Sequence, residues 1–569
     1  MARVRHVRVE NFRCIRYLDW FPARGINCLI GPGDSGKSSI LDALDFCLVA
    51  RRSLSITDAD FYGLDVSKPI TITVTLGELD DSLKSIETYG NFLRGFYDFI
   101  DRIEDEPAAG AEMVLTLRLT VGSDLDPVWT LVSDRAEAAG QSRFLTGADR
   151  ARLSPTRVGA LPDHNLAWRR GSVLNRLSEE KPDVAAALAE AARNARATFG
   201  DLADAQLGDT LKIVAQTAKE LGIALDGDLK AMLDAHSVSF NGGTIALHRS
   251  DGVPLRALGI GSMRLLLAGL QRKAAKDASV ILIDELEHGL EPHRIVRLLG
   301  SLGAKDSPEP LQAVITTHSP VAVRELDGDQ LYVVRKLADR HEVVKVGRSD
   351  AAQGTIRLYP EAFLAKAVIV CEGASEVGLL RGLDQFRVTH RQRSLAAAGV
   401  AWVDARGVNQ IYDRAWVLHS LGYRVAVLRD DDVQPDAQRE AAFLAGGNAL
   451  FKWRANCALE DELFFALPDQ AVIALVNRAV DLLDANIVDA HIRTVSNNQA
   501  GFAHYGVPVS PQLRAWLAAA AKGKANAWFK SVAKMEEVAR DIVFPYLNGA
   551  DQLFRTSITA IENWAFQDG

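Results

Sequence analysis

The order of apolar and polar residues along the chain predicts a strand, a loop and a helix near its start. Residues 3–10 alternate between charged and apolar positions with a period of two, which is typical of a strand with one buried face. Residues 26–30 form a short apolar run, as a fully buried strand does. After a glycine-rich turn, residues 37–49 carry isoleucine and leucine at helical spacing. This succession is typical of the opening of an α/β domain.

The pattern further along predicts more strands, and a second α/β domain begins near residue 366. Strands are expected at 70–76, 113–121, 244–247, 279–283, 311–317, 330–335, 367–371 and 424–428. Residues 164–236 are rich in Ala, Leu, Arg and Glu and predict a helical insertion, with a helical layer inside the same domain as the alternative. The tail from 457 is mostly helical in pattern. The expected organisation is a first domain over 1–163 and 237–348, interrupted by 164–236, and a second domain with helical additions over 349–569.

Composition and charge narrow the class of protein. The chain has 569 residues, so about three or four domains are expected. Hydrophobic residues make up 48% and charged residues 24%, which excludes a mostly disordered chain and a collagen-like repeat. The formal net charge of -8 excludes a globally basic nucleic-acid binder but leaves room for a local basic groove.

The cysteines and the N-terminus bear on the compartment. The 5 cysteines form no CxxC pair, so neither a zinc site nor a disulfide framework is expected, and a reducing cytosol is indicated. No apolar stretch reaches the roughly 18 residues that a membrane span needs, and no signal-peptide core is visible. We therefore expect a cytoplasmic protein without a membrane partner.

Residues 31–38 read GPGDSGKS, which is the G-x-x-x-x-G-K-S pattern of a P-loop between a strand and a helix. Glycines let backbone N–H groups turn toward phosphate oxygens, and the helix N-terminus adds a partial positive charge. We expect Lys37 to reach the β- and γ-phosphates of ATP and Ser38 to ligate Mg²⁺. The alternative, a glycine turn without a ligand, is disfavoured by this context. The expected nucleotide contacts are Gly31, Gly33, Asp34, Ser35, Gly36, Lys37, Ser38 and Ser39.

A second buried strand ends in two acids, within the sequence VILIDE at 280–285. We expect Asp284 to hold Mg²⁺ beside the P-loop, and Glu285 to orient or deprotonate the attacking water. Acids that merely cap a strand in solvent are the alternative, which the P-loop in the same chain disfavours. The long separation of the two motifs implies an insertion between them.

The surroundings of these acids resemble the ABC-type ATPases, in particular their RecF-like and chromosome-maintenance branch. The resemblance rests on LGIGSMRLL at 258–266, LEHGLEP at 286–292 and TTHS at 316–319. It implies a signature loop that contacts the γ-phosphate across a dimer, and a switch histidine that senses it. These residues would be Gly259, Gly261, Ser262 and His318. Because Gly259 stands where a serine is usual, ATP binding is a firmer expectation than rapid turnover.

Acidic residues also follow the strands of the second domain. In KAVIVCEGASE, residues 366–376, a buried strand delivers Glu372 into a tight turn, and Glu376 lies one helical turn further. The strand 424–428 leads to Asp430 and Asp432, which project the same way and can share a metal. Crowded carboxylates are costly without cations, and hard oxygen ligands favour Mg²⁺ or Mn²⁺. A solvated helix start is the alternative, which the second acidic pair disfavours.

This acidic pattern resembles the Toprim fold of topoisomerases, primases and some nucleases. The resemblance implies Glu372, Asp430 and Asp432 as metal ligands, while Glu376 suits a second metal. Downstream, Glu460 and Glu462 are further candidate ligands, and Lys530 or Lys534 could neutralise a phosphate, with solvated lysines as the alternative. No companion domain accompanies the nearby tyrosines, so two-metal hydrolysis is expected rather than topoisomerase chemistry.

An ABC-type ATPase followed by a Toprim domain resembles the OLD (overcoming lysogenisation defect) family of ATP-linked nucleases over nearly the whole chain. The layout is similar to the class encoded beside a UvrD-like helicase, as in the Gabija anti-phage system. The resemblance implies ATP and Mg²⁺ or Mn²⁺ as cofactors, DNA as substrate, a homodimer or higher oligomer formed through 164–236, and Lys530 as the catalytic lysine.

The expected fold is therefore α/β, with an ABC/RecF-like P-loop ATPase, a helical dimerisation insertion and a Toprim domain with helical additions. The expected function is that of an ATP-regulated, metal-dependent DNA endonuclease or nickase, in anti-phage defence or DNA repair. The alternative is a RecF-like repair or sensor ATPase whose Toprim domain binds nucleic acid without cleaving it. A transporter ATPase would leave the second acidic site unexplained.

Overall fold

The computed structural model describes residues 2–50, 54–158, 257–273, 280–501, 508–523 and 527–567, with a few isolated positions between 190 and 250. The predicted helical insertion at 164–236 and the predicted strand at 244–247 lie outside the described residues. The chain divides into two compact units. The first contains Met1–Cys14, Asp19–Asn27 and Ser38–Ile315, and the second contains Ile15–Leu18, Cys28–Lys37 and Thr316–Gly569.

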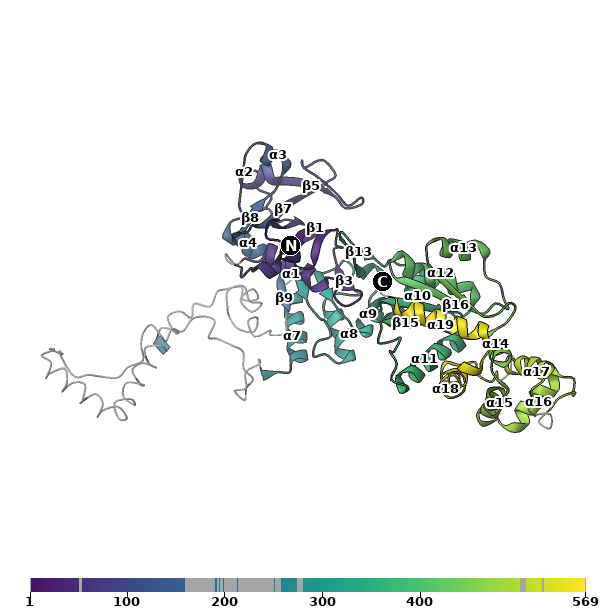
Figure 1. Cartoon of the computed structure of the whole chain (residues 1–569). Coiled ribbons are helices and arrows are strands. Elements are labelled where there is room, and N and C mark those ends of the chain that lie inside the picture. Colours follow the sequence, from purple (N-terminus) through teal and green to yellow (C-terminus); the bar gives the residue numbers. More distant parts are fainter. Residues whose placement is uncertain are drawn as a thin grey trace. The chain divides into compact units, whose positions relative to one another are not determined.

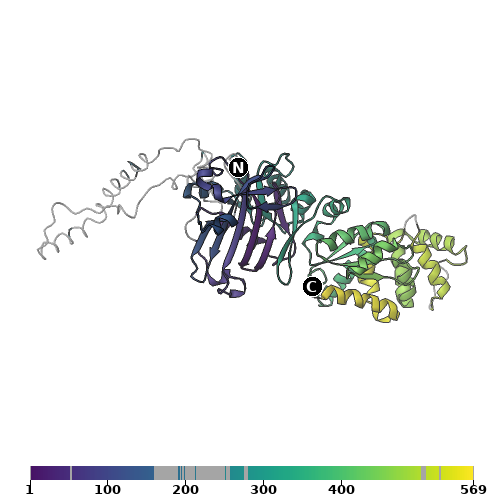
Figure 2. The ribbon, with the colours of Figure 1, turned by 90° about the horizontal axis from the view of Figure 1, so that it is seen from above.

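An antiparallel sheet forms one part of the first unit (Figure 1). Its strands run in the order β6-β5-β7-β4-β1, and β8 pairs with β7. Figure 2 shows the purple and blue strands of this sheet side by side. Their bounds are β1 (Arg3–Phe12), β4 (Ile70–Gly77), β5 (Leu93–Tyr97), β6 (Arg102–Glu104), β7 (Glu112–Val121) and β8 (Pro127–Leu131).

The two faces of this sheet differ in polarity. One face buries alternate positions such as Ile72, and helix α1 (Lys37–Leu48) lies close to it, since the Cys47 thiol points at the carbonyl oxygens of Ile72 and Leu117. The opposite face carries charged residues and threonines. Antiparallel sheets commonly show this division, because strands joined by hairpins leave one face open to solvent while the other packs on the core.

Parallel strands form the rest of the first unit's sheet structure. Strand β10 (Val280–Ile283) pairs with β9 (Thr156–Val158) and with β11 (Gln312–Thr316). The four residues of β10 are all buried, as expected of a strand covered on both faces. Two helices accompany these strands, α7 (Ile260–Lys273) and α8 (Pro292–Ser301).

In the second unit, strand β12 (Leu331–Lys336) lies between β13 (His341–Lys345) and β3 (Ile26–Ile30). It is antiparallel to β13 and parallel to β3. Strand β13 also pairs with β2 (Ile15–Trp20) at one position. The short helices α9 (Pro320–Glu325) and α10 (Asp350–Leu358) complete this part.

A separate four-stranded parallel sheet follows in the second unit. Its order is β15-β14-β16-β17, with every neighbouring pair parallel. Its bounds are β14 (Ala367–Cys371), β15 (Val400–Asp404), β16 (Arg424–Arg429) and β17 (Ala449–Lys452). Strands β14, β15 and β16 are followed by α11 (Ala374–Thr389), α12 (Val408–Ser420) and α13 (Ala437–Ala445). This βαβ succession matches the predicted second α/β domain.

The C-terminal part is helical, as the sequence pattern predicted. Its α-helices are α14 (Leu459–Ala466), α15 (Asp469–Leu483), α16 (Ala485–Val495), α17 (Pro511–Ala521), α18 (Val532–Val538) and α19 (Gln552–Phe566). Their apolar faces share one core with the sheet, in which Trp528 and Phe554 are fully buried. No helix in the described ranges has an apolar stretch of the length that a membrane span requires.

Candidate nucleotide and metal sites

The P-loop adopts backbone conformations that only glycine enters without strain. It connects β3 to α1, and Gly31 and Gly36 have φ angles of 127° and 91°. A Cβ atom on Gly31 would also lie 2.9 Å from the carbonyl oxygen of Val334 on β12. Both positions therefore require glycine, which agrees with their predicted role in turning N–H groups toward phosphates.

Lys37 at the start of α1 is folded back over the loop. Its Nζ donates to the carbonyl oxygens of Gly31 (3.1 Å) and Pro32 (2.7 Å), and it lies 3.2 Å from the Ser35 hydroxyl oxygen. An ammonium group and the helix N-terminus thus meet at one place, which is the arrangement that an anionic phosphate group needs.

The end of β10 provides the acidic partner of the P-loop helix. The Ser38 hydroxyl donates to Asp284 Oδ1 at 3.0 Å. A hydroxyl and a carboxylate at this distance are a suitable oxygen pair for Mg²⁺. Arg157, which sequence reasoning missed, lies 3.8 Å from Asp284 and 2.5 Å from Asp42. Ser39, predicted as a nucleotide contact, instead has its hydroxyl 3.4 Å from the Cys14 thiol.

Glu285 is exposed and has a φ angle of 48°, unusual for a residue other than glycine. The buried guanidinium of Arg264, on α7, donates to the Glu285 carbonyl oxygen at 2.8 Å and fixes this backbone. Sequence reasoning missed Arg264, although an arginine inside the apolar stretch SMRLLLAG was a visible signal. The helix with the predicted signature residues is therefore tied to the backbone of the predicted catalytic acid.

The predicted signature residues lie at the start of α7. Gly259 is exposed just before the helix, and the Ser262 hydroxyl accepts a hydrogen bond from Arg294 at 3.0 Å. A Cβ on Gly261 would lie 2.4 Å from the Gly289 carbonyl oxygen, so only glycine fits there. His318 is exposed directly after β11.

In the second unit, neighbouring parallel strands bring Glu372 and Asp430 to the same edge of the sheet. Cys371 at the end of β14 lies opposite Leu428 of β16, so the residues that follow these strands are adjacent. The backbone N–H of Asp430 donates to Glu372 Oε2 at 3.1 Å. Asp430 Oδ1 in turn accepts from the N–H of Leu459 at the start of α14, at 2.9 Å.

Two more carboxylates come from the first turns of helices. Glu376 on α11 accepts from the Gly373 N–H at 2.9 Å, and Glu460 on α14 accepts from the Ser375 hydroxyl at 3.2 Å. Both side chains are buried. We use the name acidic cluster for Glu372, Glu376, Asp430, Asp432 and Glu460.

Positive charge compensates the acidic cluster only in part, because the effect of burial on its pKa values is larger. Burial, helped by the nearby Asp432 carboxylate, raises the pKa of Glu372 to about 6. Burial also raises the pKa values of Glu376, Asp430 and Glu460, and repulsion from the other cluster members raises the pKa of Asp430 further. Buried carboxylates of like charge are stabilised by bound cations, so the chemistry of this donor set fits hard divalent metals.

The oxygen donors of the acidic cluster suit a divalent metal by their chemistry, but they do not form a complete coordination shell. Among the described residues, no three His, Cys, Asp or Glu side chains are already arranged as the ligands of one metal ion. The carboxylates are instead held by N–H and hydroxyl donors, as in Asp430 and Glu460.

Two acids near the cluster have other partners. Arg454 donates to both carboxylate oxygens of Glu462, at 2.8 and 2.9 Å, so the structure places this predicted metal ligand in an ion pair instead. Asp431 pairs with the fully buried Arg429 at 3.2 Å and with Lys452 at 3.2 Å. Sequence reasoning missed Arg429, which also binds Glu440.

The predicted catalytic lysine lies near the acidic cluster. Lys530 is exposed in the loop before α18, and its charge lowers the pKa values of Glu372 and Glu460 against the larger effect of burial.

The fold and the two sites define the class of the protein, a P-loop ATPase domain of the ABC type joined to a Toprim domain. The family model described as "AAA domain, putative AbiEii toxin, Type IV TA system" matches residues 26–324, and the chain belongs to this family. The model described as "Overcoming lysogenization defect protein-like, TOPRIM domain" matches residues 363–432, which include Glu372, Asp430 and Asp432.

Two relatives match parts of the chain of different length. The OLD nuclease of Thermus scotoductus is 25% identical over 484 residues, covering 77% of this chain and 83% of that protein. The DNA replication and repair protein RecF of Chlorobium phaeovibrioides is 30% identical over 105 residues, covering 16% of this chain and 28% of that protein. The predicted resemblance to the OLD family is thereby confirmed, whereas the Gabija-type class stays a prediction.

Solved structures of chromosome-maintenance heads overlap with part of the chain. An SMC head bound to the C-terminal winged-helix domain of ScpA has a TM-score of 0.36 and 15% identity, and covers 62% of this chain and 99% of that chain. The SMC head of Thermotoga maritima has a TM-score of 0.29 and 13% identity, with coverage of 61% and 99%. Likeness at this level adds nothing to the functional assignment.

Proposed function

We propose that the chain is a divalent-metal-dependent DNA endonuclease or nickase whose cleavage is regulated by ATP. The observation that carries this proposal is the acidic cluster, because five carboxylates gather at one sheet edge and burial raises the pKa values of several of them. Such a cluster destabilises a protein that does not bind cations. The relationship to the OLD nuclease gives the same reading.

In this proposal Glu372, Asp430 and Asp432 hold the divalent ions, and Glu376 and Glu460 complete the set. Mg²⁺ or Mn²⁺ suits these oxygen donors. A pair of such ions, when bound, supplies an activated water and charge compensation for the leaving oxygen of a phosphodiester. Lys530 meets the negative charge that develops on the phosphate.

The ATPase domain would bind MgATP through the P-loop, with Lys37 on the phosphates and Ser38 and Asp284 on the ion. Glu285 would orient the water, and His318 would sense the γ-phosphate. In ABC-type ATPases the signature loop acts on the nucleotide of a second copy, so Gly259, Gly261 and Ser262 would serve a homodimer or a higher homo-oligomer.

The cellular role we propose is cytoplasmic anti-phage defence or DNA repair. The support comes from the relatives, since one is an OLD nuclease and another is a RecF protein of DNA replication and repair. Membership of the class that acts with a UvrD-like helicase belongs to the same proposal. Co-purification of a helicase encoded next to this chain would test it.

Plasmid cleavage tests the main proposal. Supercoiled plasmid is incubated with the full chain and Mg²⁺ or Mn²⁺, with and without ATP, and nicked and linear products are measured. We expect metal-dependent cleavage whose rate changes with ATP. If the chain binds DNA and hydrolyses ATP but no divalent metal supports cleavage, the RecF-like alternative replaces the nuclease.

A further inference from the structure

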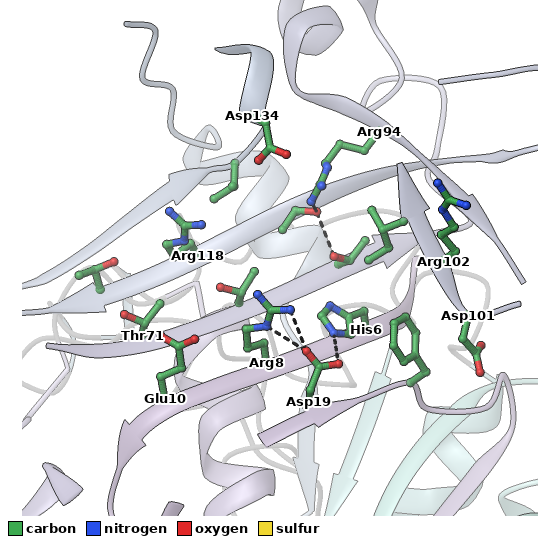
Figure 3. A pocket seen from close by; sticks show the side chains of 17 residues that line it. His6, Arg8, Glu10, Asp19, Thr71, Arg94, Asp101, Arg102, Arg118 and Asp134 are labelled. Carbon is green, nitrogen blue, oxygen red and sulfur yellow. Dashed lines mark hydrogen bonds and ion pairs between the residues drawn. The ribbon is translucent and has the colours of Figure 1, made fainter. Parts of the chain in front are cut away.

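The polar face of the antiparallel sheet contains a hollow that neither proposed site uses. Its volume is about 720 Å³, and it lies wholly within the first unit (Figure 3). We call it the sheet pocket. It is lined by His6, Arg8, Glu10, Asp19, Phe21, Thr71, Thr73, Thr75, Arg94, Asp101, Arg102, Ile103, Thr116, Arg118, Thr120, Val132 and Asp134.

Residues at paired positions on three neighbouring strands form the floor of the sheet pocket. On β1, β4 and β7, Arg8 lies opposite Thr73, and Thr73 lies opposite Arg118. Two strand spacings of about 4.8 Å place the two arginine backbones about 10 Å apart. Arg8, Thr73 and Arg118 thus form one row across the strands, and His6, Thr75 and Thr116 form the next row. Guanidinium and hydroxyl groups therefore alternate along the first of these rows.

Arginines and acids both line the sheet pocket. In Figure 3, Arg8, Arg94 and Arg118 lie around the hollow, and Asp134 lies between Arg94 and Arg118. Asp19 has two basic partners. It lies 2.9 Å from both His6 and Arg8, and these partners lower the Asp19 pKa to about 2 against the opposing effect of burial.

Two arginines of the sheet pocket are held by ion pairs. Arg94 is 15% exposed, contacts Asp105 at 3.4 Å and reaches the Thr116 hydroxyl at 3.4 Å. Arg118 is 35% exposed and contacts the exposed Glu137 at 3.1 Å. An exposed ion pair such as Arg118–Glu137 contributes little and is readily exchanged for another anion.

We infer that the sheet pocket binds phosphate groups and that the DNA backbone supplies them. Arginine and threonine side chains are common donors to DNA phosphates, and guanidinium groups match phosphate oxygens in pairs. The lining is mainly polar, unlike that of a pocket for an apolar small molecule. The inference deepens the proposed function by giving the DNA substrate a contact surface on the ATPase domain.

Fluorescence anisotropy of a labelled DNA duplex tests the inference. Binding to the full chain is measured in EDTA over a series of salt concentrations, so that no cleavage occurs. The variant Arg94→Gln/Arg118→Gln should bind about tenfold more weakly per arginine at 0.1 M salt, and its slope of log K against log salt should fall by about 2. Glu10→Gln should tighten binding, because it removes a repelling charge from the lining.

Matched controls separate phosphate binding from a structural role. Arg340→Gln removes an exposed arginine just before β13 that also pairs with a glutamate, Glu342, and should leave DNA binding unchanged. Arg118→Lys keeps the charge and should retain most of the salt slope. Thermal unfolding of every variant near the parent temperature shows that the fold is kept.

A second arm distinguishes the source of the phosphate. ADP binding is measured in the Lys37→Ala background, which disables the P-loop. If the two arginine changes abolish residual ADP binding but leave DNA binding intact, the phosphate site stands and its ligand is a free nucleotide. If the two arginine changes alter neither DNA binding nor residual ADP binding, the inference is overturned. DNA binding by a parent that never cleaves would overturn only the nuclease proposal.

Discussion

The guanidinium carbon of Arg335 lies 3.6 Å from the centre of the Tyr423 ring, and its Nε donates to the Leu421 carbonyl oxygen at 3.2 Å. Arg335 stands on β12, next to the P-loop strand β3, and Tyr423 directly precedes β16. Because β16 ends beside Asp430, one arginine connects the strand next to the P-loop with a strand that leads to the acidic cluster.

Replacing Arg335 should weaken this connection. We expect Arg335→Ala to lower the free energy of unfolding, since a desolvated cation–π contact contributes about 2 kcal/mol. We also expect ATP to change the cleavage rate less than it does in the parent. Thermal unfolding and plasmid cleavage with and without ATP measure the two effects. Arg340→Gln serves as the exposed control, and an unchanged ATP response in Arg335→Ala would exclude this route of coupling.

Substitutions of Lys37 and Glu285 should impair different steps of the ATPase reaction. Lys37→Ala should abolish ATP binding, because the ammonium group meets ground-state phosphates. Glu285→Gln should bind ATP as the parent does and lose hydrolysis, because its carboxylate acts only on the water. Paired measurements of ATP binding and phosphate release on both variants check this. Normal hydrolysis by Glu285→Gln would show that another group activates the water.

Asp430→Ala should abolish DNA cleavage and leave ATP binding intact. A displacement of the reacting groups by about 1 Å can lower the rate about 100-fold, and loss of a ligand displaces or releases a metal. The measurement is plasmid nicking with Mg²⁺ or Mn²⁺. Asp413→Asn, an exposed position on α12 that pairs with Arg439, is the matched control and should cleave as the parent does. Cleavage by Asp430→Ala at the parent rate would contradict the proposed nuclease site.

The acidic cluster predicts an unusual dependence of stability on pH in EDTA. Burial raises the pKa of Glu372 to about 6 and also raises those of Glu376 and Asp430. The folded protein therefore holds protons that the unfolded chain, with acid pKa values of about 4, releases. The contribution of these protons to the free energy of unfolding is complete below about pH 4. It is lost as the pH rises through about 6 and beyond.

Thermal unfolding between about pH 5 and 9 checks this dependence, with the sign opposite to that of ordinary paired carboxylates. The unfolding temperature should fall with rising pH in EDTA, and Mg²⁺ should offset the fall. Asp430→Asn should flatten the profile, because its amide stays neutral. An unfolding temperature that rises with pH in EDTA, and is indifferent to Mg²⁺, would contradict a metal-binding cluster.

Local patterns in the sequence determined the elements that present the main chemistry. The strands before Gly31 and Glu372 are mainly apolar, and the structure has them at Ile26–Ile30 and Ala367–Cys371 as predicted. The P-loop and the Asp430 segment were equally visible, because each follows a buried strand directly. Among the strands that were missed, β2, β8 and β17 are short and mix polar with apolar residues.

Tertiary structure alone decided which side chains meet. Glu460 and Glu462 look alike in the sequence, but two positions along a helix differ by about 200° in direction, so Glu460 turns to Ser375 and Glu462 to Arg454. The sheet pocket likewise depends on the register of strands far apart in the chain. Periodicity reports whether a position is buried, but only the folded backbone brings residues of distant segments within contact distance.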